Sequence, residues 1–271
     1  MQFQVLLAIF LSFSLPASGQ VFTDITSNAT VLSLGGATIA LSEPVAGISN
    51  DGLLGGKQRM GVWASAVLPY AISGWQVAQV QGFVKVDKNN GLGLDLSSGG
   101  TDALRETKVQ ALYGRRLGER LHIGTGIGAV GVSAAEYGSA WGVDYRLSVL
   151  AQALPQLSIG ASVQNPLAAN LSGATLPVRL RVGACWMPNK VLMISSEWDK
   201  LVDRAAEIKC GLRYQPVSRI VVQTGVRAGE TARAALGFGV QISSGLWLHV
   251  AAEWNPYLNI TPAGTAAWLK S

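Results

Sequence analysis

Residues 206–228, AEIKCGLRYQPVSRIVVQTGVRA, contain the pattern that decides the fold. From 206 to 214 apolar residues alternate with charged or small ones, and after a break at 215–218 a similar alternation runs from 219 to 228. Alternation with a period of two places successive side chains on opposite faces of a β-strand. The stretch therefore predicts two neighbouring strands, each with one apolar face and one face of charged residues and glycine.

The same pattern repeats on both sides of this stretch, from Met60 to the C-terminus. Six segments show it clearly: 178–186, 191–199, 206–214, 219–228, 232–242 and 246–254. Eight segments show it more weakly: 60–70, 76–86, 91–97, 107–115, 120–132, 140–152, 156–165 and 258–269. The total of 14 is even, as single-chain bacterial barrels require, and a count of 12–14 fits the pattern. Residues 60–271 leave about 15 residues for each strand and its turn, which suits short connections.

Composition favours a membrane barrel over a soluble β-sandwich, which is the competing all-β interpretation. Hydrophobic residues make up 49% of the 271 residues and charged residues only 14%, against about 25% charged in ordinary soluble domains. The predicted strands are also longer than the roughly 5 or 6 residues usual in sandwiches. Aromatic residues stand near predicted strand ends, as in barrel girdles: Tyr70, Trp186, Trp198, Tyr214 and Trp254. We predict an all-β fold, a transmembrane antiparallel β-barrel of about 14 strands whose apolar face meets outer-membrane lipid.

The first 59 residues do not share the strand pattern. An apolar run over 5–15 is followed by the small residues Ala17, Ser18 and Gly19, which is typical of a cleaved secretory signal. Residues 20–59 are rich in glycine and other small residues, without sustained alternation. We predict a signal peptide over 1–19, a hatch or plug folded into the lumen over 20–59, and the barrel over 60–271.

Charged residues gather on one predicted face of the C-terminal strands, which in a barrel lines the lumen. They are Arg179, Arg181, Glu197, Asp199, Glu207, Lys209, Arg213, Arg219, Arg227, Arg233 and Glu253. One interpretation is a ladder of ion pairs between adjacent strands that satisfies buried charge and holds the plug. The other is a net-positive lining that binds or passes an anionic ligand.

Signals for other functions are weak. Residues 126–131 match GxGxxG, but they lie in a strand-like run with no helical pattern after them, so they do not predict a dinucleotide site. The basic residues are dispersed, so nucleic acid is not a predicted partner. His122 and His249 are too few for a metal cluster, and no set of catalytic residues stands out. We therefore expect no enzymatic activity, no cofactor and no metal.

The opening LGGATIAL at 34–41, followed by ISNDGL at 48–53, resembles the "GGA-x-VA … NPAGL" opening of an outer-membrane superfamily. That superfamily includes the FadL long-chain fatty-acid transporters and the PorV/PorQ barrels of the Bacteroidetes type IX secretion system. Short matches follow in order: ALYG at 111–114, LHIG at 121–124, LSIG at 157–160, QNP at 164–166, GLRY at 211–214, TGVRAG at 224–229 and LGFG at 236–239. The resemblance places a hatch motif at Gly35, Gly36, Asn50 and Gly52, with Asn-Asp-Gly in place of the family's Asn-Pro-Ala.

What the resemblance implies is a 14-stranded barrel with an N-terminal hatch, in the outer membrane of a Gram-negative, Bacteroidetes-like bacterium. The main functional hypothesis is a non-enzymatic accessory of secretion or surface attachment, with secretion-system or surface-protein partners. The alternative is a FadL-like transporter that passes a small hydrophobic or amphipathic molecule. The chain is shorter than expected for the superfamily, which implies short extracellular loops and slightly favours the accessory role.

Overall fold

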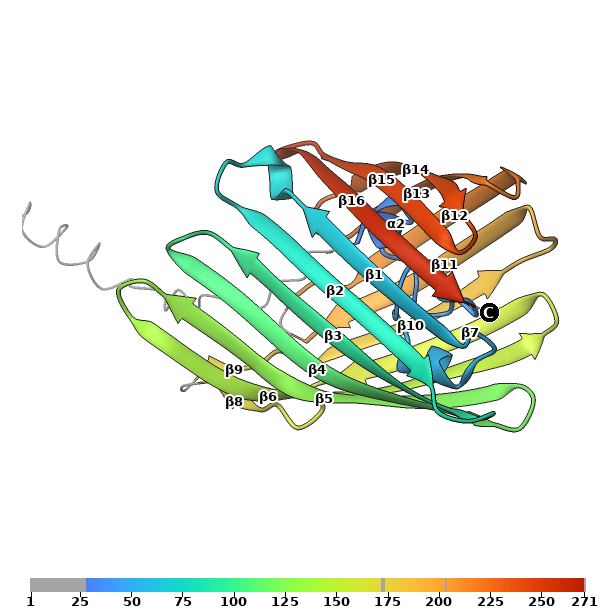
Figure 1. The fold of residues 1–271 in the computed structure, drawn as a ribbon. Coiled ribbons are helices and arrows are strands. Elements are labelled where there is room, and N and C mark those ends of the chain that lie inside the picture. Colours follow the sequence, from blue (N-terminus) through green and yellow to red (C-terminus); the bar gives the residue numbers. More distant parts are fainter. Residues whose placement is uncertain (1–27, 172–173, 203, 271) are drawn as a thin grey trace, which may run out of the picture.

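The chain forms a closed antiparallel barrel of 14 strands (Figure 1), seen in a computed structural model that describes residues 28–171, 174–202 and 204–270. The first seven barrel strands are β1 (Met60–Val67), β2 (Gln76–Lys85), β3 (Asn90–Gly100), β4 (Leu104–Leu117), β5 (Leu121–Ala134), β6 (Gly138–Leu154) and β7 (Leu157–Gln164). The other seven are β10 (Arg179–Trp186), β11 (Leu192–Leu201), β12 (Glu207–Val217), β13 (Ile220–Ala228), β14 (Arg233–Ser243), β15 (Leu246–Asn255) and β16 (Asn259–Lys270). Each strand pairs with its neighbours in sequence, and β16 closes the barrel on β1.

The predicted 14-strand antiparallel barrel is confirmed, and every predicted strand overlaps a barrel strand. Some of the weaker predictions were too short: β6 begins two residues before 140 and ends two after 152, and β4 begins three residues before 107. Others were too long, since β1 ends three residues before 70 and β7 spans 157–164 rather than 156–165. Two short strands were not predicted, β8 (Asn170–Leu171) and β9 (Ala174–Thr175), which form a hairpin between β7 and β10. The predicted signal peptide and residues 20–27 lie outside the described residues. None of the helices in the described ranges has the length and apolar character that a bilayer crossing requires.

The two ends of the barrel differ in their connections. At one end, here called the short-turn rim, six hairpins are joined by two to five residues, and β16 ends there. At the other end, the long-loop rim, connections include 68–75 and 165–178. The first of these contains a short 3-10 helix, η2 (Pro69–Ala71). Bacterial outer-membrane barrels place their short turns on the periplasmic side.

The exterior of the barrel is an apolar band bounded by aromatic residues. Trp186, Tyr214 and Trp268 are exposed near the short-turn rim, while Trp198 and Trp254 are exposed near the long-loop rim. Trp268 pairs with Leu246 on β15, eight residues from Trp254, which is about 26 Å along a strand. At the usual barrel tilt this is roughly 20 Å of height, near the apolar band of such barrels. Tyr70, also predicted for the girdle, is instead half-buried in η2.

Residues 28–56, here called the N-terminal segment, lie against the inward faces of the strands. Its helix α2 (Ala29–Ser33) contacts β13 to β16, and its 3-10 helix η1 (Asp51–Gly55) contacts β2 to β6. Asn28 begins α2 because its side-chain oxygen accepts hydrogen bonds from the backbone nitrogens of Thr30 (2.8 Å) and Val31 (3.4 Å). The segment therefore reaches opposite walls of the barrel; that it acts as a plug stays a prediction.

Candidate functional site

The N-terminal segment rests on strand positions that carry no side chain. A Cβ added at Gly160 would lie 2.1 Å from the carbonyl oxygen of Ile39, and one added at Gly225 would lie 2.2 Å from the nitrogen of Gly35. Backbone atoms of the segment also leave no room for a Cβ at Gly114, Gly124 and Gly211, whereas at Gly183 and Gly237 the near atoms of the segment belong to the side chains of Ile39 and Ser33. These seven glycines, here called the glycine seat, let the segment lie against the wall, so a larger residue there must displace it.

One buried carboxylate joins the segment to the wall of β10 and β11. Oε2 of Glu197 accepts hydrogen bonds from the backbone nitrogens of Thr38 and Ile39, both at 2.9 Å. The guanidinium of Arg181 holds the same carboxylate in a bidentate pair, with Nε at 2.7 Å from Oε1 and Nη2 at 3.1 Å from Oε2. Bidentate, charge-assisted contacts are among the strongest hydrogen bonds in proteins. Glu197 was predicted as a lumen charge, and the structure places it as the main polar contact of residues 38–39.

A second buried ion pair fixes the other end of the segment. Arg146 on β6 pairs with Asp51 through two contacts, one of them Nε to Oδ2 at 2.8 Å. The backbone nitrogen of Asp51 also donates to the hydroxyl of Ser148 at 3.1 Å. Both partners of this pair were missed by sequence reasoning as site residues, although Asp51 is the residue at which the hatch motif departs from the superfamily pattern.

The residues of the predicted hatch motif shape the segment itself. Gly35 and Gly36 end α2 with φ angles of 62° and 83°, a region that glycine adopts without strain. Asn50 caps η1 by accepting from the nitrogen of Gly52 at 2.9 Å. Its Nδ2 donates to the carbonyl of Ile39 at 3.0 Å and to that of Val149 on β6 at 2.9 Å. Asn50 therefore ties two stretches of the segment to each other and to the wall.

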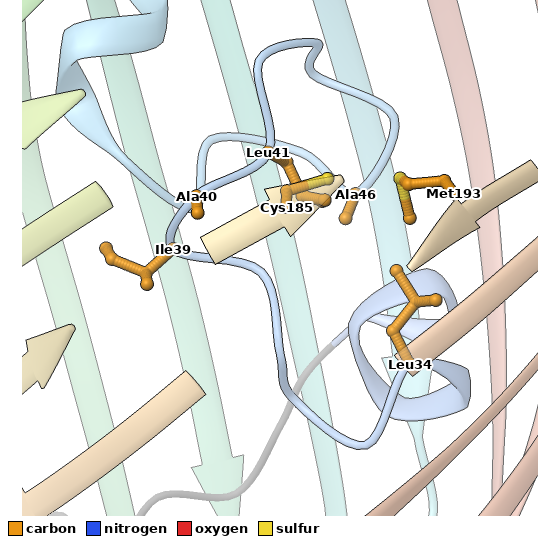
Figure 2. Close-up of a cluster of buried hydrophobic side chains, with 7 residues drawn as sticks. All are labelled: Leu34, Ile39, Ala40, Leu41, Ala46, Cys185 and Met193. Carbon is orange, nitrogen blue, oxygen red and sulfur yellow. The ribbon is translucent and has the colours of Figure 1, made fainter. Parts of the chain in front are cut away.

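An apolar cluster completes the contact between the segment and the C-terminal half of the barrel (Figure 2). Leu34, Ile39, Ala40, Leu41 and Ala46 of the segment pack with Cys185 of β10 and Met193 of β11. All seven are buried, and Leu34 and Cys185 are fully so. Inside a barrel whose outer face is also apolar, this cluster gives the segment its own small hydrophobic core.

The predicted charge ladder forms two separate groups. In the first, Arg179 pairs with Asp199, Arg181 pairs with Glu197, and Lys209 contacts both acids and Glu207 (3.6 Å). In the second, Glu253 lies 2.7 Å from Arg227 and 3.7 Å from Arg233. Most of these side chains are buried. Most of the pairs join neighbouring strands, but Arg227 on β13 reaches Glu253 on β15 across β14.

Two predicted lumen residues stand apart from these groups. Arg213 faces inward, but its guanidinium donates a hydrogen bond to the side-chain oxygen of Gln215 at 2.7 Å, and it belongs to neither of the two groups. The placement of Arg219 in the lumen was wrong, because it lies in the two-residue turn between β12 and β13 and is exposed. The register of that hairpin shifts between Tyr214 and Val217. The alternation of inward- and outward-facing side chains along β12 therefore does not continue through the turn.

Strands of the N-terminal half supply further lumen charges, of both signs, that the sequence patterns did not single out. Asp144 accepts hydrogen bonds from Gln110 (2.6 Å) and Gln164 (2.8 Å) and lies 3.5 Å from Lys108. Asp95 accepts from Gln79 (2.7 Å) and Gln81 (3.0 Å). These acids, with Asp51 and Glu106, offset the excess of arginine and lysine on the C-terminal strands. The alternation in VDYRL at 143–147 is the sequence signal that could have revealed Asp144 and Arg146 as lumen residues.

A cavity of about 490 Å³ lies between the N-terminal segment and the long-loop rim. Val31 and Ile48 line it from the segment, and Val77, Val130 and Leu176 line it from the wall and the loop before β10. Its charged lining is Asp95, Glu106, Lys108, Asp144, Arg146, Arg179, Arg181 and Lys209. Each of the five cations in this lining is paired with an acid. The volume falls within the roughly 300–1,000 Å³ typical of ligand pockets.

The closed 14-strand antiparallel barrel is a fold that this chain shares with FadL-like and TodX-like outer-membrane barrels. Among solved structures, the CymD monoaromatic hydrocarbon channel matches with a TM-score of 0.69 and 12% identity, over 93% of this chain and 99% of that one. The Ralstonia pickettii toluene transporter TbuX matches with a TM-score of 0.68 and 14% identity, over 92% and 99%. A Pseudomonas aeruginosa FadL homologue matches with a TM-score of 0.69 and 9% identity, over 91% and 99%.

These likenesses establish the fold. No protein-family profile and no curated protein matches the sequence. The part of the predicted resemblance that concerns FadL-like barrels therefore holds at the level of structure, while a PorV/PorQ identity and a Bacteroidetes source stay predictions.

Proposed function

We propose that the chain is a channel of the Gram-negative outer membrane that passes a small hydrophobic or amphipathic molecule, with the N-terminal segment as its plug. The observation that carries this proposal is the cavity above the segment, whose lining combines aliphatic side chains with charges that are already paired. An apolar ligand body can contact Val77, Val130 and Leu176, while a polar group meets Asn28, whose side-chain nitrogen is buried without a partner. Two of the matched structures are a monoaromatic hydrocarbon channel and a toluene transporter, which supports the same function.

Within this proposal the predicted charges hold neighbouring strands together and hold the N-terminal segment against the wall. Each cation that lines the cavity has an acidic partner, so a free anion would have to break an ion pair before it could bind there. Breaking a buried pair costs several kcal/mol, about 3–5. The contacts therefore favour a role in holding the wall and the plug over a selectivity filter for anions.

Filling the cavity tests transport directly. Ser97 on β3 lines the cavity, whereas the next residue, Ser98, belongs to the opposite face of the strand. We expect Ser97→Trp to reduce uptake of a permeating probe several-fold, because the indole occupies space that the ligand needs. Uptake of toluene and of a medium-chain carboxylate is measured in cells that express each variant, with barrel insertion checked by heat-modifiable mobility on gels.

Ser98→Trp is the matched control, because it adds the same side chain one residue away, about 3.8 Å along the chain, but on the outer face. It should leave uptake at the wild-type rate. Equal uptake in cells with and without the protein, for both probes, would count against the channel function.

A role as an accessory of secretion or surface attachment is the second candidate. Loop tips of the long-loop rim expose large apolar side chains: Tyr137 is 90% exposed, Tyr257 81% and Leu167 76%. Exposed apolar groups outside the membrane band are typical of surfaces that bind a partner.

This candidate predicts a partner that stays bound in mild detergent. We expect Tyr137→Ser combined with Tyr257→Ser to release that partner, since both substitutions remove apolar contact area without touching the barrel wall. Affinity purification from the native membrane, followed by protein identification, measures the result. Purification of the wild-type barrel alone would argue for the channel function instead.

A further inference from the structure

The basic residues of the chain are concentrated at one rim. Six exposed cations, here called the basic patch, lie at the short-turn rim: Lys57, Arg59, Lys88, Arg115, Arg120 and Lys270. They come from β16 and the strands β1 to β5, which are adjacent in the barrel. None of the six forms an ion pair with another of the described residues. At the long-loop rim, by contrast, the cations Arg105, Lys200 and Arg204 are matched by Asp102, Glu136 and Glu230.

Backbone hydrogen bonds show that the patch is continuous. The nitrogen of Arg59 donates to the carbonyl of Lys270 (3.0 Å), and the carbonyl of Arg59 accepts from Lys85 (2.8 Å). Further along the rim, Asn90 is paired with Arg115. The six cations are spread over more than 200 positions in sequence, and closure of the barrel brings them to one arc.

The acids at this rim do not neutralise the patch. The carboxylate of Asp87 accepts from the backbone nitrogens of Asn89 (2.7 Å) and Asn90 (2.9 Å) and from the side chain of Asn90 (2.7 Å). These hydrogen bonds, with a smaller contribution from the charge of Arg115, lower the pKa of Asp87, and they hold its carboxylate in the β2–β3 turn. Glu119 is the other acid in these turns.

The outer surface next to the patch is apolar. Val62, Val84 and Leu117 are exposed on the exterior of β1, β2 and β4, with exposed fractions of 40–50%. Arg115 and Lys270 occupy the same outward-facing alternation, at the ends of β4 and β16. A surface that continues from an apolar band into exposed cations matches the two parts of a phospholipid, the acyl chains and the phosphate.

We propose that the basic patch binds the headgroups of anionic phospholipids in the leaflet that faces the short-turn rim. The patch follows the membrane boundary across six adjacent strands, which fits a layer of headgroups better than an acidic protein segment. Anionic lipid would then fix the depth and tilt of the barrel on the side where residues 51–57 meet the wall.

Native mass spectrometry tests the proposal. The intact barrel is reconstituted in vesicles of phosphatidylcholine with a minor share of phosphatidylglycerol, and the lipids it retains are counted. Wild-type protein should retain phosphatidylglycerol well above its share in the vesicle. The double variant Arg115→Glu with Lys270→Glu should lower that enrichment by about tenfold, since each basic residue near an anionic surface adds to the attraction.

The matched control is Arg105→Glu with Lys200→Glu, two outward-facing positions at the long-loop rim, which should retain the wild-type enrichment. Raising the salt concentration should weaken enrichment in the wild-type protein, a measurement that needs no variant to fold. No enrichment in the wild-type protein, insensitivity to salt, or equal loss in both double variants would overturn the proposal. It would also be overturned if the Arg115/Lys270 variant kept its phosphatidylglycerol but lost an acidic protein partner.

Discussion

Gly225→Leu is expected to unseat the N-terminal segment and raise the flux of small hydrophilic solutes through the barrel. An added Cβ at this position would lie 2.2 Å from the nitrogen of Gly35 and 2.2 Å from the carbonyl carbon of Leu34. Both contacts are backbone atoms, so no flexible side chain can move aside. Overpacking of this kind costs about 1–3 kcal/mol, which corresponds to roughly a five- to 150-fold increase in the population of the displaced segment.

The flux is measured as swelling of proteoliposomes in a disaccharide solution, or as sensitivity of cells to a hydrophilic antibiotic. Gly264→Leu provides the control, because an added Cβ at Gly264 on β16 meets nothing within 4 Å. That variant should keep the wild-type permeability. If Gly225→Leu folds as a barrel and its permeability does not rise, the glycine seat does not determine whether the lumen is closed.

Local alternation was sufficient to predict the barrel because every strand carries its own pattern. The lumen contacts were harder to predict because they join residues far apart in sequence. Asp51 and Arg146 are separated by 95 positions, and no local pattern relates them. Backbone donors such as those of Thr38 and Ile39 have no sequence signature at all. The sequence therefore predicted that Glu197 faces the lumen, but not which groups donate hydrogen bonds to it.

The ion pairs also show how register limits prediction from sequence. Arg181 stands directly opposite Asp199 on β11, yet its guanidinium pairs with Glu197, two positions away, while Asp199 pairs with Arg179 and Lys209. Diagonal contacts of long side chains across a strand pair are common, so adjacency predicts the ladder but not its partners. The basic patch was missed for a related reason, because its residues are dispersed along the chain and meet only when β16 closes on β1.

The second large effect is expected from Glu197→Ala. This substitution removes the carboxylate that accepts hydrogen bonds from the backbone nitrogens of Thr38 and Ile39. Each hydrogen bond to a charged group contributes about 1.5–3 kcal/mol, so losing both should speed amide hydrogen exchange of residues 34–41 by about a hundredfold or more. Exchange is measured by mass spectrometry on the barrel in detergent. Glu197→Gln should retain part of the protection, because its amide oxygen still accepts a hydrogen bond but lacks the charge that Arg181 neutralises.

Glu253→Ala is the control that distinguishes loss of the contact between Glu197 and the N-terminal segment from a general weakening of the barrel wall. Glu253 is also buried and paired with two arginines, Arg227 and Arg233, so its removal leaves comparable charge uncompensated. Its ion pairs are with strand residues, and exchange of residues 34–41 should therefore stay at the wild-type rate in this variant. A similar rise in both alanine variants would mean that the segment responds to the stability of the barrel as a whole. A rise confined to Glu197→Ala means that this one carboxylate holds the centre of the segment.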